Sequence, residues 1–141
     1  MNEKVKYWLD LSDYDYTTAV AMQQSGRYLY VGFMCHQTIE KILKAYFNLN
    51  NSEPAPFTHS LSYIAKKAGI YESLTDKFKD FIDILEPLNI EARYPSHNVH
   101  PGGAGGLILR RAVGRRALLR CCSLAAADNC QAERNQRHYQ N

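Results

Sequence analysis

Long apolar runs are missing from this 141-residue sequence, and at no point do about 18 apolar residues follow one another. We therefore expect no membrane-spanning segment and no membrane partner. The first ten residues are charged and lack the apolar stretch and cleavage site of a signal peptide. These absences predict a cytoplasmic protein.

Cysteine is also scarce, with four residues at positions 35, 121, 122 and 130. This distribution builds neither a disulfide framework nor a zinc-ligand spacing, so we predict no metal site and no cofactor. Apolar residues nevertheless make up 45% of the chain and aromatic residues 11%. That content is enough for one modest hydrophobic core, which favours a folded domain over a disordered chain.

Charge divides the sequence near Ser96 and His97. Residues 1–96 carry ten Lys and Arg against twelve Asp and Glu, a net charge of −2, whereas residues 97–141 carry seven Arg against two acidic residues, a net charge of +5. The second segment also contains five of the eight glycines. We therefore predict a helical domain over residues 1–96 and an Arg- and Gly-rich tail over residues 97–141.

Two interpretations of the tail stay open. An Arg-rich segment preceded by paired glycines suits an arm that binds nucleic acid. However, its arginines and leucines scatter around the helical wheel, and the abrupt change from Lys to Arg is what a shift of reading frame would produce. The second interpretation is therefore a disordered or non-native segment.

Helical periodicity runs from Lys4 to about Leu88, and no segment shows the alternation of a strand. This stretch divides into four helical segments. The residues that start or end these helices are Ser25 and Gly26, Thr58 or Ser60, Gly69, Ser73 or Thr75, and Pro87. The pattern predicts an all-α fold, an antiparallel up-down helical bundle of four to five helices.

The segment over residues 27–49 is the clearest helix, because its apolar residues fall within one arc of roughly 120°. Polar side chains gather on the opposite side, which we expect to face solvent: His36, Gln37, Glu40, Lys41 and Lys44. A solvated pair of Glu40 with Lys44 explains their i,i+4 spacing as well as a phosphate or partner contact does.

Three short patterns occur in order on this helical background: residues 35–45 (CHQTIEKILKA), residues 58–61 (THSL) and residues 91–95 (EARYP). Together they resemble the HEPN domain (higher eukaryotes and prokaryotes nucleotide-binding), over about residues 3–96. The resemblance implies a helical bundle that forms a homodimer and acts as a nucleotide- or RNA-associated subunit. It also implies pairing with a small nucleotidyltransferase, in a module that resembles a toxin–antitoxin system.

The resemblance also selects candidate ligand-binding residues: Gln37, Lys41, His59, Arg93 and Tyr94. Arginine beside an aromatic side chain suits phosphate and base contacts, which makes Arg93 and Tyr94 the central pair. Structural roles are the alternative: Arg93 would then bridge to an Asp or Glu of a neighbouring helix, and His59 would belong to a helix cap.

Some HEPN proteins are metal-independent ribonucleases that use an Arg and a His separated by four to six residues. Arg93 would then hold the scissile phosphate, and His97 or His100 would move the proton of the 2′-hydroxyl. Three residues separate Arg93 from His97 and six separate it from His100, so His100 is the candidate that fits the spacing. Tyr94 departs from the pattern, because the ribonucleases usually have Asn, Asp or His there.

A third interpretation is a non-catalytic protein-interaction module, in which the polar side of residues 27–49 binds a partner protein. The effect of Arg93→Ala separates the three interpretations. It abolishes RNA cleavage in a ribonuclease, weakens nucleotide binding in a binding subunit, and leaves a partner interface on residues 27–49 intact.

Overall fold

The computed structural model describes residues 2–94, and this part of the chain contains helices and no strand. Its elements are α1 (Glu3–Gln24), α2 (Tyr28–Asn50), α3 (Leu61–Lys67), the short 3-10 helix η1 (Tyr71–Ser73), α4 (Asp76–Leu85) and α5 (Leu88–Glu91). The prediction of an all-α helical bundle is confirmed. The predicted tail over residues 97–141, with His97 and His100, lies outside the described residues.

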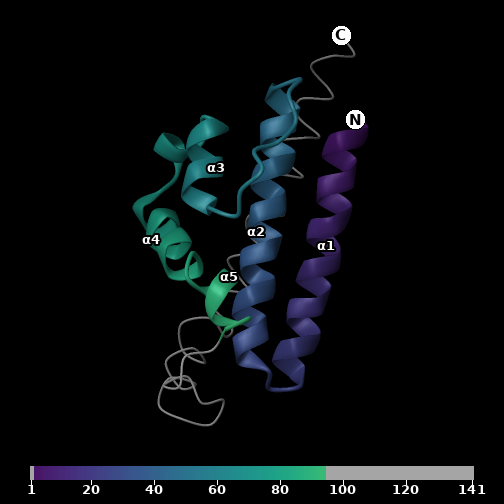
Figure 1. Cartoon of the computed structure of the whole chain (residues 1–141), viewed down its shortest axis with the longest axis vertical. Helices are drawn as coiled ribbons and strands as arrows, with labels where there is room; N and C mark the ends of the chain where they lie inside the picture. The colour runs from purple at the N-terminus through teal and green to yellow at the C-terminus, as the bar shows by residue number, and fades with distance from the viewer. Residues whose placement is uncertain (1, 95–141) are drawn as a thin grey trace.

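The first two helices form an antiparallel hairpin (Figure 1). Asn2 caps α1, because its side-chain oxygen accepts a hydrogen bond from the backbone nitrogen of Lys4 at 3.0 Å. Gly26 lies in the turn with a φ of +74°, a conformation that residues with a Cβ rarely adopt. The chain therefore reverses at the predicted position, after Ser25.

Polar side chains cap the start of α3, and a glycine follows its end. Of the two predicted caps the structure selects Ser60, whose Oγ accepts a hydrogen bond from the backbone nitrogen of Tyr63 at 3.4 Å. Glu86, just after α4, accepts from the backbone nitrogen of Ser62 at 2.9 Å. Gly69, with a φ of +75°, lies just beyond the end of the helix, as the sequence predicted.

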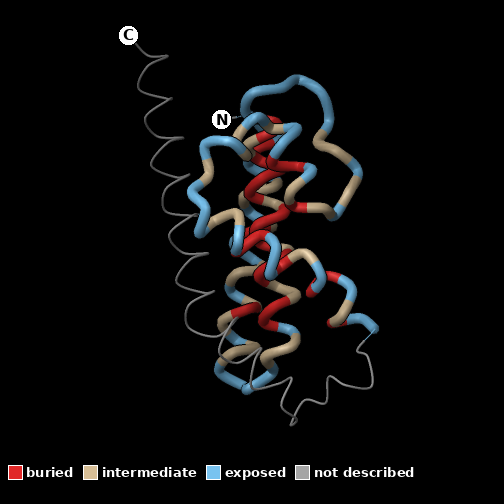
Figure 2. Tube along the Cα trace, turned by 90° about the vertical axis from the view of Figure 1, so that its left-hand side faces the viewer, coloured by how far each residue is buried: buried red, intermediate tan, exposed pale blue. Residues whose placement is uncertain are grey.

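α2 is the central helix of the bundle. It has α1 on one side and α3 and α4 on the other (Figure 1), and it contacts each of the other α-helices. Figure 2 shows that many of the buried positions follow this central element. The core contains side chains from all five α-helices: Ala19, Val31, Cys35, Ile39, Ile42, Leu43, Leu61, Ile64, Ala65, Phe81, Ile82, Leu85 and Leu88.

The polar side of α2 does not face solvent as predicted. His36, Glu40 and Lys44 have exposed fractions of only 0%, 3% and 7%. The Glu40–Lys44 pair, at 2.8 Å, is therefore buried rather than solvated. The periodicity of one helix shows where its apolar residues lie, but it cannot show that neighbouring elements also cover the polar side. Here the Trp8 ring of α1 lies 5.1 Å from the Lys44 Nζ atom and covers part of it.

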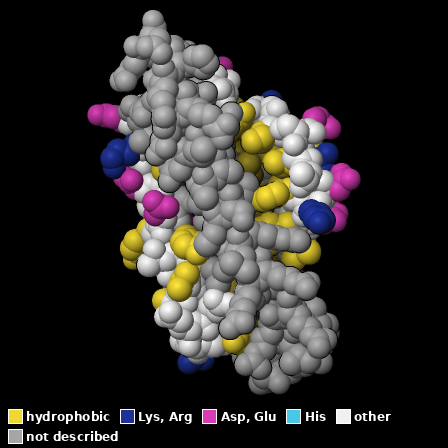
Figure 3. All heavy atoms as spheres, turned by 180° about the vertical axis from the view of Figure 1, so that it is seen from behind, with side chains coloured by type: hydrophobic (Ala, Val, Ile, Leu, Met, Phe, Trp, Pro, Cys, Tyr) yellow, Lys and Arg dark blue, Asp and Glu magenta, His cyan; other side chains and the backbone are white. Residues whose placement is uncertain are grey.

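Within residues 2–94, no helix combines the length and the apolar character that a membrane span requires. One face of the molecule shows apolar side chains between charged groups at its edges (Figure 3). Exposed large aromatic residues include Tyr14 at 73% and Tyr94 at 77%.

Candidate functional site

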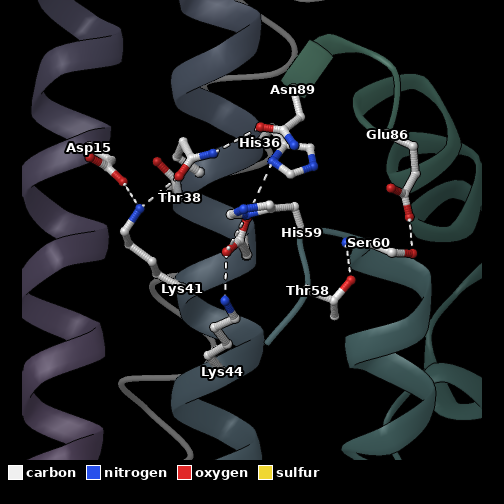
Figure 4. Close-up of polar contacts among 12 residues, drawn as sticks. Asp15, His36, Thr38, Lys41, Lys44, Thr58, His59, Ser60, Glu86 and Asn89 are labelled. Atoms are coloured by element: carbon white, nitrogen blue, oxygen red, sulfur yellow. Dashed lines mark hydrogen bonds and ion pairs between the residues drawn. The ribbon is translucent and has the colours of Figure 1, made fainter. Parts of the chain in front are cut away.

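A chain of polar side chains crosses the bundle from α1 to the residues just after α5. Lys41 Nζ forms an ion pair with Asp15 of α1 and donates a hydrogen bond to Gln37 Oε1 at 3.1 Å (Figure 4). Gln37 Nε2 donates to Asn89 Oδ1 at 3.3 Å, and Arg93 Nη2 donates to the same oxygen at 3.2 Å. Three of the predicted ligand-binding residues, Gln37, Lys41 and Arg93, thus belong to one hydrogen-bonded chain.

Arg93 is held in place by neutral groups. Its Nε atom donates to the backbone oxygen of Asn89 at 3.0 Å, and its Cζ atom lies 6.0 Å from the centre of the Phe33 ring. None of the ion pairs within residues 2–94 includes Arg93, so the bridge to an acidic residue is not found there. Arg93 and the adjacent Tyr94 are both exposed. The guanidinium is therefore an oriented positive charge that a ligand can reach.

His59 belongs to a second polar cluster, which surrounds Glu40. Glu40 accepts a hydrogen bond from Lys44 Nζ at 2.8 Å, and His59 Nδ1 lies 3.0 Å from its Oε2 atom. Figure 4 shows that His59 reaches this cluster from the loop before α3. The same loop also has cap geometry, since Thr58 Oγ1 accepts from the backbone nitrogen of Ser60 at 3.2 Å. His59 is thus placed in a different cluster from Arg93.

Two buried groups in this second cluster have shifted pKa values. Burial disfavours the charged form of Glu40, but the hydrogen bonds from Lys44 and His59 outweigh it and lower the pKa of this carboxyl. Burial lowers the pKa of His36 to about 4, against the opposing effect of Glu40 and Glu86. His36 is therefore neutral at pH 7, and its approach to Glu40 at 3.8 Å is not an ion pair.

His36 is also unusual in its hydrogen bonding. Its exposed fraction is 0%, and in the described part of the chain neither ring nitrogen has a hydrogen-bond partner with good geometry, although the backbone of His59 makes a weak contact with the ring. A buried polar group without a partner costs folding free energy, about 1–3 kcal/mol for a neutral group. This side chain was expected on a solvent-facing surface, and no feature of the sequence alone indicates its burial.

Asn89 is the site residue that sequence reasoning missed. It is 7% exposed, and its Oδ1 atom joins Gln37 to Arg93. One signal was available, because Asn89 precedes Arg93 by four residues and this spacing places two side chains on the same helical face. Its other partner, Gln37, lies 52 residues away in the sequence, so only the fold brings them together.

An apolar groove of about 400 Å³ lies elsewhere, between the start of α1 and the end of α2. The groove is lined by Glu3, Lys4, Tyr7, Trp8, Asn48, Pro54 and Ala55. None of these is a predicted site residue. Residues 2–94 contain no group of three or more His, Cys, Asp or Glu side chains that could hold a metal ion.

Comparison with protein-family models gives a match to the model described as HEPN domain, over residues 5–122. This range covers more than half of the chain and includes every predicted site residue. It also runs past position 96, and the domain boundary proposed there stays a prediction. Comparison with curated proteins and with solved structures gave no match.

Proposed function

This chain belongs to the HEPN domain family, and from that premise we propose that it is a nucleotide- or RNA-associated subunit. Its binding site centres on Arg93 and Tyr94. Gln37 and Lys41 belong to the same hydrogen-bonded chain of polar residues as Arg93, which crosses the bundle.

The observation that carries this proposal is that Arg93 has no acidic partner within residues 2–94. Among these residues its guanidinium contacts an amide and an aromatic ring, so a phosphate group can bind it without displacing one of their acidic side chains. Lys41 differs, because Asp15 already compensates its charge. The exposed ring of Tyr94 adds a surface on which a base can stack.

In this fold, most of the polar side of α2 is covered, and this is the surface that the interaction-module interpretation requires. Of the five polar residues expected to bind a partner, His36, Glu40 and Lys44 are buried. Gln37 and Lys41 are hydrogen-bonded within the bundle and only partly exposed. Few groups on this side of α2 remain for a partner protein.

We also propose two partners for this subunit: a second copy of the chain, as a homodimer, and a small nucleotidyltransferase in a toxin–antitoxin-like module. Sedimentation of the purified chain tests the homodimer. Co-expression of a tagged chain with a candidate nucleotidyltransferase, followed by affinity purification, tests the second partner.

Arg93→Ala tests the binding site itself. We expect the full chain with this substitution to bind a labelled single-stranded RNA about tenfold or more weakly, because a hydrogen bond to a charged group contributes about 1.5–3 kcal/mol. Fluorescence anisotropy at one fixed salt concentration measures the affinity, since phosphate contacts depend on salt.

Lys77→Ala is the matched control, because it also removes one exposed positive charge and lies on α4. We expect it to change the RNA affinity less than about twofold, as for an exposed charge that is not part of the proposed site. An equal loss in both variants would mean that only net charge matters and would contradict the proposed site. Absence of nucleotide and RNA binding by the parent chain would contradict the function.

The same RNA samples decide between binding and cleavage. If the parent shortens the RNA without added metal, and neither Arg93→Ala nor His100→Ala does so, the chain is a ribonuclease instead. Intact RNA together with binding that depends on Arg93 would support the binding subunit.

A further inference from the structure

We infer that Asn89 is a positioning residue, which orients the guanidinium of Arg93 so that one defined edge receives a phosphate group end-on. This inference rests on the proposed function, because the phosphate of a nucleotide or RNA is the ligand concerned. It adds a residue that neither the sequence patterns nor the family match identified.

Asn89 occupies one edge of the guanidinium. Its backbone oxygen accepts a hydrogen bond from Arg93 Nε at 3.0 Å, and its Oδ1 atom accepts from Arg93 Nη2 at 3.2 Å. Arginine has five N–H donors in a rigid planar fork, and these two bonds use the edge formed by Nε and Nη2. Within residues 2–94, two donors on Nη1 and one on Nη2 remain for a ligand.

The remaining donors determine which ligand fits. One N–H of Nη1 and one of Nη2 lie side by side at the end of the fork, and this pair matches two oxygens of a phosphate group. Both the non-bridging oxygens of an RNA phosphodiester and the oxygens of a nucleotide phosphate meet this requirement. The exposed position of Arg93 lets either reach the free edge.

Asn89 is itself held firmly, so it can fix the orientation of its neighbour. Its Oδ1 atom accepts from both Gln37 and Arg93, which uses both lone pairs of that oxygen. Gln37 is in turn held by Lys41 at 3.1 Å. Asn89 is 7% exposed, so the packed bundle restricts its rotation. The role of Gln37 and Lys41 is therefore to support Asn89.

A neutral amide is required for this role. Aspartate has nearly the same shape and accepts the same two hydrogen bonds, but its negative charge compensates Arg93 and competes with a phosphate. Asn89→Asp therefore keeps the geometry and removes the available charge. Asn89→Ala does the reverse, because it leaves Arg93 charged and removes the Oδ1 contact.

The first experiment measures RNA affinity and thermal unfolding for the full chain and both variants. We expect Asn89→Asp to weaken RNA binding about tenfold, as loss of the charged contact does, while its unfolding midpoint equals or exceeds that of the parent. We expect Asn89→Ala to weaken binding about threefold, because the orientation of Arg93 is then less restricted.

The second experiment examines Arg93 without RNA, with inorganic pyrophosphate as the probe. Phenylglyoxal modifies accessible arginines, and mass spectrometry of the resulting peptides reports each one separately. We expect pyrophosphate to protect Arg93 in the parent and to protect it much less in Asn89→Asp. Arg27, the exposed arginine at the start of α2, is the internal control and should react equally in all samples.

These outcomes separate the inference from the proposed function. If the parent binds neither RNA nor a nucleotide but pyrophosphate protects Arg93 only when Asn89 is present, the proposed function fails and the inference stands. Equal RNA affinity and equal protection in the parent and Asn89→Asp overturn the inference. A large fall in the unfolding midpoint of Asn89→Asp also overturns it. The inference requires this variant to keep the same hydrogen bonds as the parent.

Discussion

At the scale of single residues, neighbours in the fold decide which charges are available. Lys41 and Arg93 belong to the same polar chain, yet Lys41 is paired with Asp15 whereas Arg93 is held by neutral groups. Both were selected from the sequence as candidate ligand-binding residues, with Arg93 and Tyr94 as the central pair. In the proposed site, their different environments favour Arg93 as the ligand contact and Lys41 as a supporting residue.

His36 leads to a prediction about pH. Its pKa is about 4 in the folded chain, below the ordinary histidine value of 6.5, so the unfolded chain binds a proton more readily between these values. The stability from neutral His36 is complete above pH 6.5 and is lost as pH falls toward 4. We expect the free energy of unfolding to fall by about 2 kcal/mol from pH 7 to pH 5 through this group.

Urea unfolding of the parent and His36→Leu at pH 7, 6 and 5 measures this effect. We expect the substituted chain to lose much less stability over the same range, because leucine does not bind a proton. The lowered pKa of Glu40 contributes stability that is lost only as pH falls below the ordinary glutamate value of 4.5, outside this window. Parallel pH profiles for the two chains would contradict a neutral, buried His36.

At the scale of elements, α3 depends on its caps. It spans seven residues, and a helix this short is not stable alone in water. Ser60 supplies the cap that the sequence predicted, whereas Glu86 reaches the same end from beyond α4. The first contact is local in sequence and the second, 24 residues away from Ser62, is not.

Glu86→Ala is expected to destabilise the chain by about 1–3 kcal/mol, because the donors of Ser62 lose their charged acceptor. Chemical denaturation at pH 7 measures the loss. Glu72→Ala is the control, since Glu72 is 89% exposed and lies 4.0 Å from Lys79, a distance at which a surface ion pair contributes little. Similar losses in both variants would show that Glu86 does not stabilise α3.

At the scale of the whole molecule, the central position of α2 joins the other helices into one cooperative unit. Ile39 lies in the shared core and is 2% exposed. We expect Ile39→Ala to cost about 2–5 kcal/mol and to lower the stability of all helices together, because each of them contacts α2. Thermal unfolding followed by far-UV circular dichroism measures both the loss and the number of transitions.

Ile90→Ala is the matched control, because the same substitution is made where the side chain is 61% exposed. We expect a loss of less than about 1 kcal/mol, since little apolar surface leaves the core. Two separate transitions for Ile39→Ala would contradict the cooperative role of α2.

The sequence by itself determined the helices, because periodicity, caps and glycines act over a few neighbouring residues. It placed the turn at Gly26, the cap of α3 at Thr58 or Ser60, and the end of α3 before Gly69. It also selected Gln37, Lys41 and Arg93 through a family resemblance, without showing that they are connected. Their roles as ligand-binding residues stay predictions.

Only the tertiary structure decided which polar residues are buried and which charges are compensated. The burial of His36, the pairing of Lys41 with Asp15 and the bridging position of Asn89 all depend on contacts between different helices. Such contacts join residues that lie far apart in the sequence, and the pattern within one helix carries no information about them. In the proposed site, the availability of Arg93 for a phosphate therefore depends on the packing of the bundle.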